Sequence, residues 1–282
     1  MPSFGQRLEA VFAARGQLCL GIDPHAFLLE SWGLPDTAAG LREFGLRCVD
    51  AATGVVGIVK PQVAFFERHG SAGYAALEDV LAAARAAELL IIADAKRGDV
   101  GSTVAAYGAA WLTPGSPLEV DAVTVSAYQG VGSLSGALEL AKAGDKGMFV
   151  LAATSNPESV APQNAVLDRG ESVGRTVAAS IVAEVHLLNS TAAGLGSTGV
   201  VIGATVAFPD YGINAGELKS TPILGPGFGE QGAQVTDLSV LYGAVCRNVV
   251  VNVSRSVLRA GPNGLRSDLT HQAELLIGVA GS

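Results

Sequence analysis

Eight short apolar segments recur along the chain, and most of them are followed by a stretch in which apolar residues have helical spacing. Each segment is apolar on both faces, which is typical of parallel strands covered by helices. Eight such strands alternating with helices over about 250 residues predict a (β/α)8 barrel. The segments are LCLGID (18–23), GIVK (57–60), LLIIADAK (89–96), AVTVSAY (122–128), GMFVLAATS (147–155), GVVIGAT (199–205), TPILGPG (221–227) and NVVVNVS (248–254).

A doubly wound open sheet is the main alternative architecture. Dinucleotide-binding sheets of that class carry G-x-G-x-x-G after the first strand, whereas LGIDPH (20–25) stands at this place. No repeat of fixed period and no low-complexity linker divides the chain. We therefore expect residues 1–282 to form a single barrel domain, with the segments 154–172 and 205–220 as loops that cover one end of it.

The overall charge and hydropathy limit the classes of ligand and partner. A net charge of −8 leaves no general basic face, so no nucleic acid is expected as a partner. No apolar run reaches the ~18 residues of a membrane span, and the N-terminal segment has no signal-peptide core, so we expect a cytoplasmic enzyme without a membrane partner. Cys19, Cys48 and Cys246 lie among apolar residues and are expected to be buried free thiols.

Charged residues stand where several of the predicted strands end. The first strand ends in Asp23, the second in Lys60, and the third in Asp94 and Lys96, with Asp99 close behind. Barrels of this kind build their active sites at the carboxyl ends of the strands. A structural rim of ion pairs is the alternative interpretation. Because bringing these charges together costs several kcal/mol for each unpaired ion, we favour a functional site.

Side chains alternate along the third predicted strand. Asp94 and Lys96 share one face, while Ala93 and Ala95 take the other. The small alanines leave room for helices packed outside. The two charged side chains are therefore expected to point into the barrel at its catalytic end.

The last two predicted strands end in features suited to a phosphate group. ILGPGFGEQG (223–232) contains Gly225, Gly227 and Gly229, which allow backbone amides to approach an anion closely. Arg255 ends the eighth strand, and its planar guanidinium suits bidentate phosphate binding. Because the loops after strands seven and eight are the usual phosphate site of such barrels, the sequence predicts a phosphorylated ligand.

Taken together, these residues resemble the orotidine 5′-phosphate decarboxylase family. IIADAKRGDVGST (91–103) matches the family's D-x-K-x-x-D signature, and TSNP (154–157), GPGFGEQG (225–232) and the dipeptide SR (254–255) follow in the family's order. The chain length and the segment RGDVGST (97–103) resemble those of the longer bacterial subclass of this family. The resemblance implies conversion of orotidine 5′-monophosphate (OMP) to uridine 5′-monophosphate (UMP) and carbon dioxide in pyrimidine biosynthesis, with neither a cofactor nor a metal.

The resemblance also implies a role for each charged residue. Lys96 would protonate C6 of the pyrimidine as carbon dioxide leaves, and Asp94 would lie beside the departing carboxylate. Lys60 and Asp23 would complete the charged chain and hold the ribose hydroxyls. Since the reaction leaves a carbanion with no obvious electron sink, fixed charges would have to stabilise it.

Further roles follow from the same resemblance. Asp99 and Thr103 would reach into the active site of the neighbouring subunit, so a homodimer is expected. Ser155 would contact the pyrimidine edge, and Gln231 with Arg255 would hold the phosphate.

Four further residues lie in or near the expected site. Pro226 and Gly227 are expected to bind the phosphate as part of its loop. Phe228 stands where the family often has a smaller aliphatic residue, which leaves its contact open. For His25 we expect a position behind the site or at the surface.

Three other functions fit parts of the pattern. Magnesium-dependent hexulose-phosphate synthases and keto-gulonate-phosphate decarboxylases share D-x-K-x-x-D but carry an acid at the end of strand two, where Lys60 stands here. A Schiff-base aldolase would use Lys96 as its nucleophile, but a lysine between carboxylates is held protonated and is a poor nucleophile. A catalytically silent phosphosugar-binding barrel is the remaining alternative.

Overall fold

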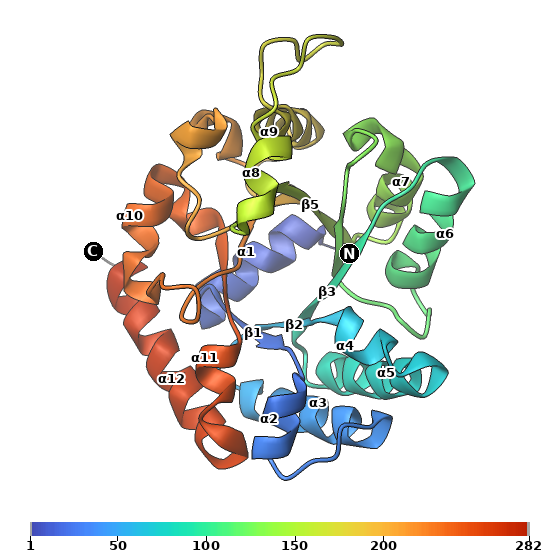
Figure 1. Ribbon diagram of the computed structural model, residues 1–282, viewed down its shortest axis with the longest axis vertical. Helices are drawn as coiled ribbons and strands as arrows, with labels where there is room; N and C mark the ends of the chain where they lie inside the picture. The colour runs from blue at the N-terminus through green and yellow to red at the C-terminus, as the bar shows by residue number, and fades with distance from the viewer. Residues whose placement is uncertain (1, 281–282) are drawn as a thin grey trace.

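The chain folds into a closed barrel of eight parallel strands that pair in sequence order, with β8 returning to β1. The computed structural model describes residues 2–280, and Figure 1 shows the strands surrounded by helices. Every strand falls within, or within one residue of, a predicted apolar segment, so the barrel prediction is confirmed. The strands are β1 Leu18–Ile22, β2 Ile58–Pro61, β3 Leu90–Arg97, β4 Ala122–Val125, β5 Gly147–Ala153, β6 Thr198–Ile202, β7 Ile223–Gly225 and β8 Val249–Val253.

Helices cover the outer face of the barrel. Most lie between successive strands, as the alternating pattern predicts, and short 3-10 turns fill several of the remaining connections. The α-helices are α1 Phe4–Arg15, α2 Ala26–Ser31, α3 Ala38–Ala52, α4 Val63–Glu67, α5 Gly70–Ala86, α6 Gly101–Leu112, α7 Ser135–Ala143, α8 Val160–Gln163, α9 Val177–Leu188, α10 Leu238–Tyr242, α11 Arg255–Leu258 and α12 Gly261–Ala280.

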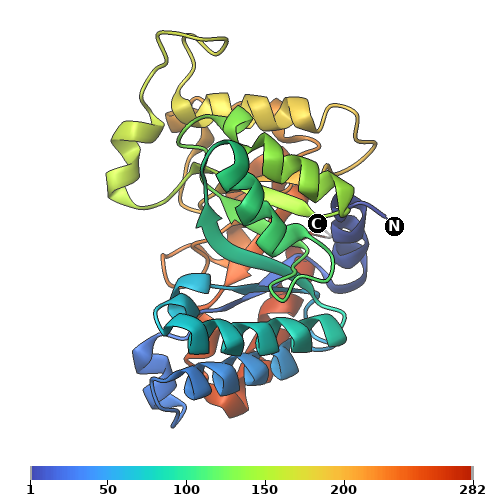
Figure 2. The same cartoon turned by 90° about the vertical axis from the view of Figure 1, so that its right-hand side faces the viewer.

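The interior of the barrel is filled by apolar side chains at its amino-terminal end. Phe4 and Leu8 of α1 belong to the same buried cluster as inward-facing strand residues, and the rings of Phe4 and Phe149 meet edge to face at 5.9 Å. At Gly147 a Cβ would lie only 2.3 Å from the Phe4 ring, so glycine is required there. α1 lies at the amino-terminal end of the barrel, on the opposite side from α8, which follows the carboxyl end of β5 (Figure 2). The open end is therefore the carboxyl end of the strands.

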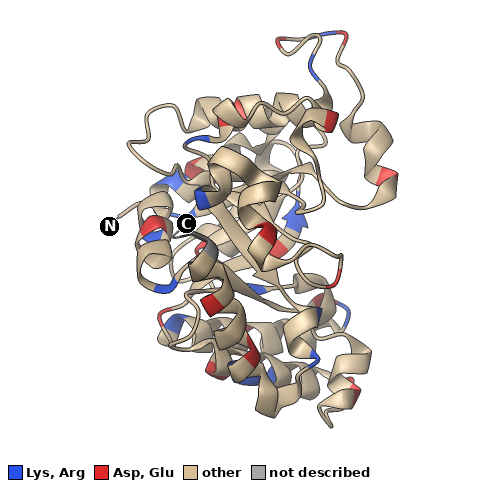
Figure 3. Cartoon of the chain, turned by 90° about the vertical axis from the view of Figure 1, so that its left-hand side faces the viewer, with Lys and Arg blue, Asp and Glu red and all other residues tan. Residues whose placement is uncertain are grey.

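Two connections that follow the carboxyl ends of β5 and β6 contain the segments that the sequence predicts as loops, 154–172 and 205–220. The connection from β5 to α9 carries α8 and then projects as a loop over residues 164–176, drawn at the top of Figure 1. Charged residues of both signs stand at its tip (Figure 3). The segment 205–220 forms two 3-10 turns, Phe208–Tyr211 and Ala215–Leu218.

The cysteines and the hydropathy agree with a packed interior. Cys19 and Cys48 are buried free thiols as expected, whereas Cys246 is only half-buried. Burial raises the pKa of the Cys19 thiol to about 12, so this group stays protonated at neutral pH. Within residues 2–280, no helix combines the length and the apolar character needed to cross a bilayer.

Candidate active site

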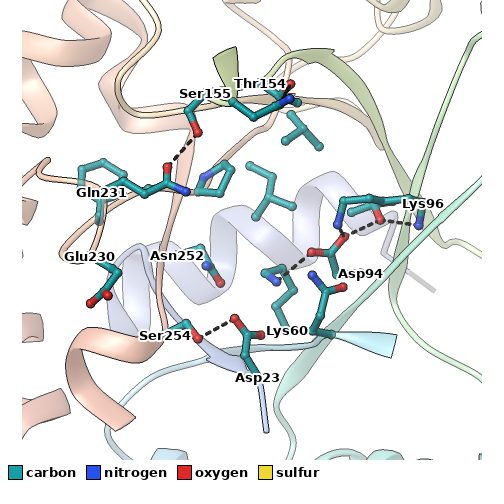
Figure 4. A pocket seen from close by; sticks show the side chains of 18 of the residues that line it. Asp23, Lys60, Asp94, Lys96, Thr154, Ser155, Glu230, Gln231, Asn252 and Ser254 are labelled. Atoms are coloured by element: carbon teal, nitrogen blue, oxygen red, sulfur yellow. Dashed lines mark hydrogen bonds and ion pairs between the residues drawn. The ribbon is translucent and has the colours of Figure 1, made fainter. Parts of the chain in front are cut away.

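A cavity of about 480 Å³ opens at the carboxyl ends of the strands. It brings together all of the predicted site residues except Asp99 and Thr103, from segments that lie more than 200 residues apart in the chain. Those that line it are Asp23, Lys60, Asp94, Lys96, Ser155, Pro226, Gly227, Gln231 and Arg255. Figure 4 shows most of them around the cavity.

Asp94 is the centre of the charged group. Its Oδ2 accepts a hydrogen bond from Lys60 Nζ at 3.0 Å, and its Oδ1 accepts one from Lys96 Nζ at 2.5 Å. Thr124 Oγ1 donates to the same Oδ1 at 2.9 Å. The Lys60 side chain is only 4% exposed, whereas that of Lys96 is 47% exposed. The carboxylate therefore fixes one lysine inside the barrel and one at the floor of the open cavity.

Mutual stabilisation keeps this group ionised. Burial alone would raise the pKa of the Asp94 carboxyl, but Lys60 and Lys96 hold that pKa well below its usual range. Burial alone would likewise lower the pKa of Lys60, but Asp94 and Asp23 hold it above its ordinary value. At neutral pH the site thus carries an ionised carboxylate between two ammonium groups.

The backbone changes conformation at the end of β3. Leu90 and Ile92 belong to the inner cluster, and Asp94 continues this inward-facing series, so the predicted alternation holds that far. Lys96 then has φ 48°, in the left-handed region, and the pairing with β4 shifts register between Ala93 and Arg97. Asp94 and Lys96 both line the cavity, but the regular alternation that the sequence predicts ends before the lysine.

Asp23 and Asn252 provide acceptor atoms that have no partner. Ser254 Oγ donates to Asp23 Oδ2 at 2.6 Å, while Asp23 Oδ1 and Asn252 Oδ1 are buried without a hydrogen-bond partner in the structure. Asp23 follows β1, and Asn252 and Ser254 lie at the end of β8, so closure of the barrel brings them together. An unsatisfied buried acceptor costs about 1–3 kcal/mol, which a ligand that donates hydrogen bonds would relieve.

The loops after β5 and β7 meet across the cavity mouth. Ser155 Oγ donates to Gln231 Oε1 at 2.7 Å, as Figure 4 shows. The φ of 111° at Gly227 is accessible to glycine but strained for other residues. Gly227 and Gln231 both line the cavity.

The Glu230 carboxylate lies beside Arg255, the residue predicted to bind the phosphate. Arg255 Nη1 is 3.7 Å from Glu230 Oε1, and Arg259 Nη2 is 2.9 Å from the same oxygen. Arg255 and Glu230 both line the cavity. Glu230 therefore competes with any bound anion for the Arg255 guanidinium.

Asp99 and Thr103 do not line the cavity of their own chain. Asp99 Oδ1 accepts from the Val100 amide at 2.8 Å, and Thr103 is exposed on the first turn of α6. Val100, which follows Asp99, and Tyr107, which follows Thr103 on α6, are exposed apolar or aromatic residues, and Tyr128 after β4 is 93% exposed.

Sequence reasoning missed several uncharged residues of the cavity wall. Thr124 and Asn252 carry no charge that would distinguish them from ordinary strand residues, and Ser254 was matched as part of the SR dipeptide but given no role. Gln62, which directly follows β2, is another. Thr154, Asn156 and Glu230 lie in the matched segments TSNP and GPGFGEQG but were given no role of their own, and Leu151, Val201 and Leu224 complete the wall.

The two residues left open by the sequence are placed by the structure. Phe228 is buried in the cavity wall and stacks near Tyr242 with ring centroids 6.4 Å apart. His25 packs between Phe27 and Phe65 behind the site and does not line the cavity, in agreement with the expectation. The partial burial of His25 lowers its pKa.

Among the residues described, no three or more His, Cys, Asp or Glu side chains lie together in a group that could hold a metal ion.

The barrel and the charged cavity at its carboxyl end define an enzyme of the (β/α)8 class. Residues 16–266 match the family model described as Orotidine 5′-phosphate decarboxylase / HUMPS family. This chain therefore belongs to that family, and the resemblance seen in the sequence is confirmed.

Individual relatives agree with the family assignment. The orotidine 5′-phosphate decarboxylase of Salinispora tropica is 50% identical over 263 residues, which are 93% of this chain and 92% of the relative. That of Streptomyces coelicolor is 50% identical over 266 residues, with coverage of 93% and 92%. A crystal structure from Streptomyces avermitilis matches with a TM-score of 0.93 at 48% identity, covering 100% of this chain and 97% of the other. The structure of Leishmania donovani OMP decarboxylase matches at 0.75 and 28% identity, covering 99% and 100%.

Proposed function

We propose that this chain is an orotidine 5′-phosphate decarboxylase that converts OMP to UMP and carbon dioxide. The observation that carries the proposal is the buried ionised Asp94 held between Lys60 and Lys96 in the cavity. Charged groups that are held in place around a reacting centre can stabilise a carbanion. The proposal treats residues 1–282 as one decarboxylase domain, which the barrel from β1 to β8 supports.

In the proposed reaction, the bond between C6 and the substrate carboxylate breaks and its electron pair stays on C6. The Lys96 ammonium stabilises this charge and then donates a proton to C6, while carbon dioxide departs. An ammonium ~4 Å from the developing carbanion contributes about 4 kcal/mol at an effective dielectric constant near 20. This interaction is stronger in the transition state than in the ground state, so it lowers the barrier.

Asp94 has two roles in this proposal. Its Oδ1 accepts the hydrogen bond that holds the Lys96 ammonium in the cavity, and its Oδ2 accepts one from Lys60. It also lies beside the departing carboxylate, where repulsion is relieved as carbon dioxide leaves.

The remaining cavity residues bind parts of the substrate remote from the broken bond. Asp23 and Lys60 are assigned to the ribose hydroxyls, and the unpartnered Oδ1 of Asp23 supports that assignment. Ser155 is assigned to the pyrimidine edge, and Gln231 and Arg255 to the phosphate. Pro226 and Gly227 shape the phosphate loop. Binding energy from these contacts can hold the reacting centre in its charged surroundings.

Asp99 and Thr103 are assigned to the active site of a second copy of this chain. Their absence from their own cavity and the exposed Val100, Tyr107 and Tyr128 near them support a homodimer through this surface. Mixing Lys96→Ala with Asp99→Ala tests the assignment, because a heterodimer then holds one site with both native residues. Activity in the mixture that neither variant has alone supports sharing. An inactive mixture whose subunits have exchanged refutes it.

The reaction itself is tested by the ultraviolet absorbance of OMP after addition of purified, EDTA-treated protein. We expect turnover to UMP at the rate of the untreated protein. Turnover that requires added Mg²⁺, or acts on a sugar phosphate in place of OMP, would favour the metal-dependent enzymes that share the signature. UMP binding without turnover would favour a silent binding protein.

A further inference from the structure

We propose that Thr124 is a positioning residue that holds Lys96 in the backbone conformation needed for proton transfer. The residue lies on β4, next to the end of β3, and its hydroxyl contacts both the Lys96 backbone and the Asp94 carboxylate. The inference rests on the proposed function, because Lys96 is the proton donor only in that reaction.

The first observation is the unusual backbone of Lys96. The other residues besides glycine with positive φ in the part of the chain that is described are Glu88 and Asp145. Both stand in short turns between a helix and the next strand, where left-handed residues are common. Lys96 instead has φ 48° within a strand, beside a register shift. A left-handed residue in such a place persists only when its surroundings hold it, and such residues cluster at active sites.

The second observation is what holds it. The Lys96 amide donates to Thr124 Oγ1 at 3.0 Å, and that hydroxyl donates to Asp94 Oδ1 at 2.9 Å. Thr124 is itself 1% exposed. One hydroxyl thus links the backbone of the lysine to the carboxylate that its own ammonium contacts.

The direction of both hydrogen bonds follows from the groups involved. An amide N–H can only donate, and an ionised carboxylate can only accept. The single hydroxyl proton must therefore point to Asp94, and an oxygen lone pair must receive the Lys96 amide. Serine can make both bonds, whereas valine, which has nearly the same shape as threonine, can make neither.

The same contacts constrain the ammonium. Lys96 Nζ lies 2.5 Å from Asp94 Oδ1, the oxygen that Thr124 also contacts. The backbone at one end of the lysine side chain and the carboxylate at the other are held by the same hydroxyl. Loss of that hydroxyl frees Lys96 to leave the left-handed region, which displaces its ammonium. A displacement of ~1 Å in a catalytic group can reduce the rate about 100-fold.

The experiment compares Thr124→Val with Thr124→Ser. We expect kcat to fall about 10- to 100-fold in Thr124→Val, while the Kd for UMP stays within about threefold, because the ribose and phosphate contacts are untouched. Thr124→Ser should restore kcat to within about threefold of the native value, since it keeps both hydrogen bonds. Thr221→Val is the matched control. It removes a buried hydroxyl that lies ahead of β7 and contacts Asn189, and it should lose stability without loss of kcat.

Two results would overturn the inference. A Thr124→Val protein with native kcat would show that the hydroxyl does not position the lysine. A Thr124→Ser protein as slow as Thr124→Val would show that the methyl group, and not the hydroxyl, matters. If Thr124→Val fails to fold, Thr124→Ala takes its place with the same expectations.

A crystal structure of the variant separates this inference from the proposed function. If native protein fails to decarboxylate OMP, the proposed function is wrong. The position of Lys96 in Thr124→Val still tests the role of the hydroxyl. Departure of Lys96 from the left-handed region supports that role, and an unchanged φ refutes it.

Discussion

Replacement of Asp94 by asparagine tests the electrostatic core of the site most directly. The change keeps the shape of the side chain but removes the charge that Lys60 and Lys96 share. Lys96 can turn toward solvent, whereas Lys60 cannot, because its side chain is only 4% exposed. The main consequence is therefore a buried ammonium that has lost its nearest counter-ion.

The distance in the structure gives the size of the effect. At 3.0 Å between Lys60 Nζ and Asp94 Oδ2, the pair attraction is about 5.5 kcal/mol at an effective dielectric constant near 20. Removing one partner of a buried pair typically costs about 3–5 kcal/mol. Asp23 still stabilises the Lys60 ammonium, so we expect a cost in the lower part of that range. We expect the free energy of unfolding to fall by ~3 kcal/mol at pH 7 and the Tm by roughly 5–10 °C.

The folding stability depends on pH with opposite signs in the native protein and in the Asp94→Asn variant. In the native protein the folded pKa of Lys60 lies above its unfolded value. Its contribution is fully present below the unfolded pKa of about 10.4 and is lost as pH rises through the folded pKa. In the variant, burial dominates and the folded pKa falls below the unfolded one. Stability is then lost as pH falls through that folded pKa, so the variant gains stability from pH 7 toward pH 10.

Urea and thermal unfolding between pH 6 and pH 10 measure both effects. Asp79→Asn is the matched control, because it breaks an exposed ion pair with Arg42 and should cost at most about 1 kcal/mol. A loss below 1 kcal/mol in Asp94→Asn, or the same pH slope as the native protein, would refute the reasoning about Lys60.

Three further predictions concern activity and binding. Lys96→Ala should remove nearly all turnover of OMP and leave the Kd for UMP within a few-fold, and a variant that kept a tenth of the rate would exclude Lys96 as the proton donor. Arg255→Ala should raise KM about 10- to 100-fold, because a charge-assisted hydrogen bond contributes about 1.5–3 kcal/mol, and an unchanged kcat/KM would mean that the phosphate lies elsewhere. Glu230→Gln should tighten UMP binding in calorimetry, because the native carboxylate competes for Arg255. Glu217→Gln, which breaks a separate ion pair with Arg175, is its control and should leave the Kd unchanged.

The strand pattern and the charged strand ends could be read from the sequence because both are local. A segment such as LLIIADAK is apolar on both faces wherever it is placed, so it predicts a strand between helices. Its final charges then lie at the carboxyl end by position alone. Asp23, Lys60, Asp94 and Lys96 were found in this way, and all four line the cavity. Arg255 and the glycine-rich turn were found by the same argument from strand ends.

The uncharged part of the site was decided by the tertiary structure. Ser254 contacts Asp23 across 231 positions of sequence, and Thr124 contacts Asp94 across 30. A serine or threonine at a strand end is common, and nothing local distinguishes one that completes a charged group. These contacts exist because β8 closes onto β1 and β4 pairs with β3. Strand register across a closed barrel is a property of the whole ring.

For Lys96, the sequence determines one part of its geometry and the tertiary structure the other. The sequence determined that a lysine follows Asp94 by two positions, and alternation predicted that both point inward. The structure instead turns the backbone left-handed at the lysine and holds it through a hydroxyl on the next strand. A left-handed lysine is unfavourable in isolation, so no local pattern predicts it. Only the neighbouring strand supplies the hydrogen bond that stabilises it.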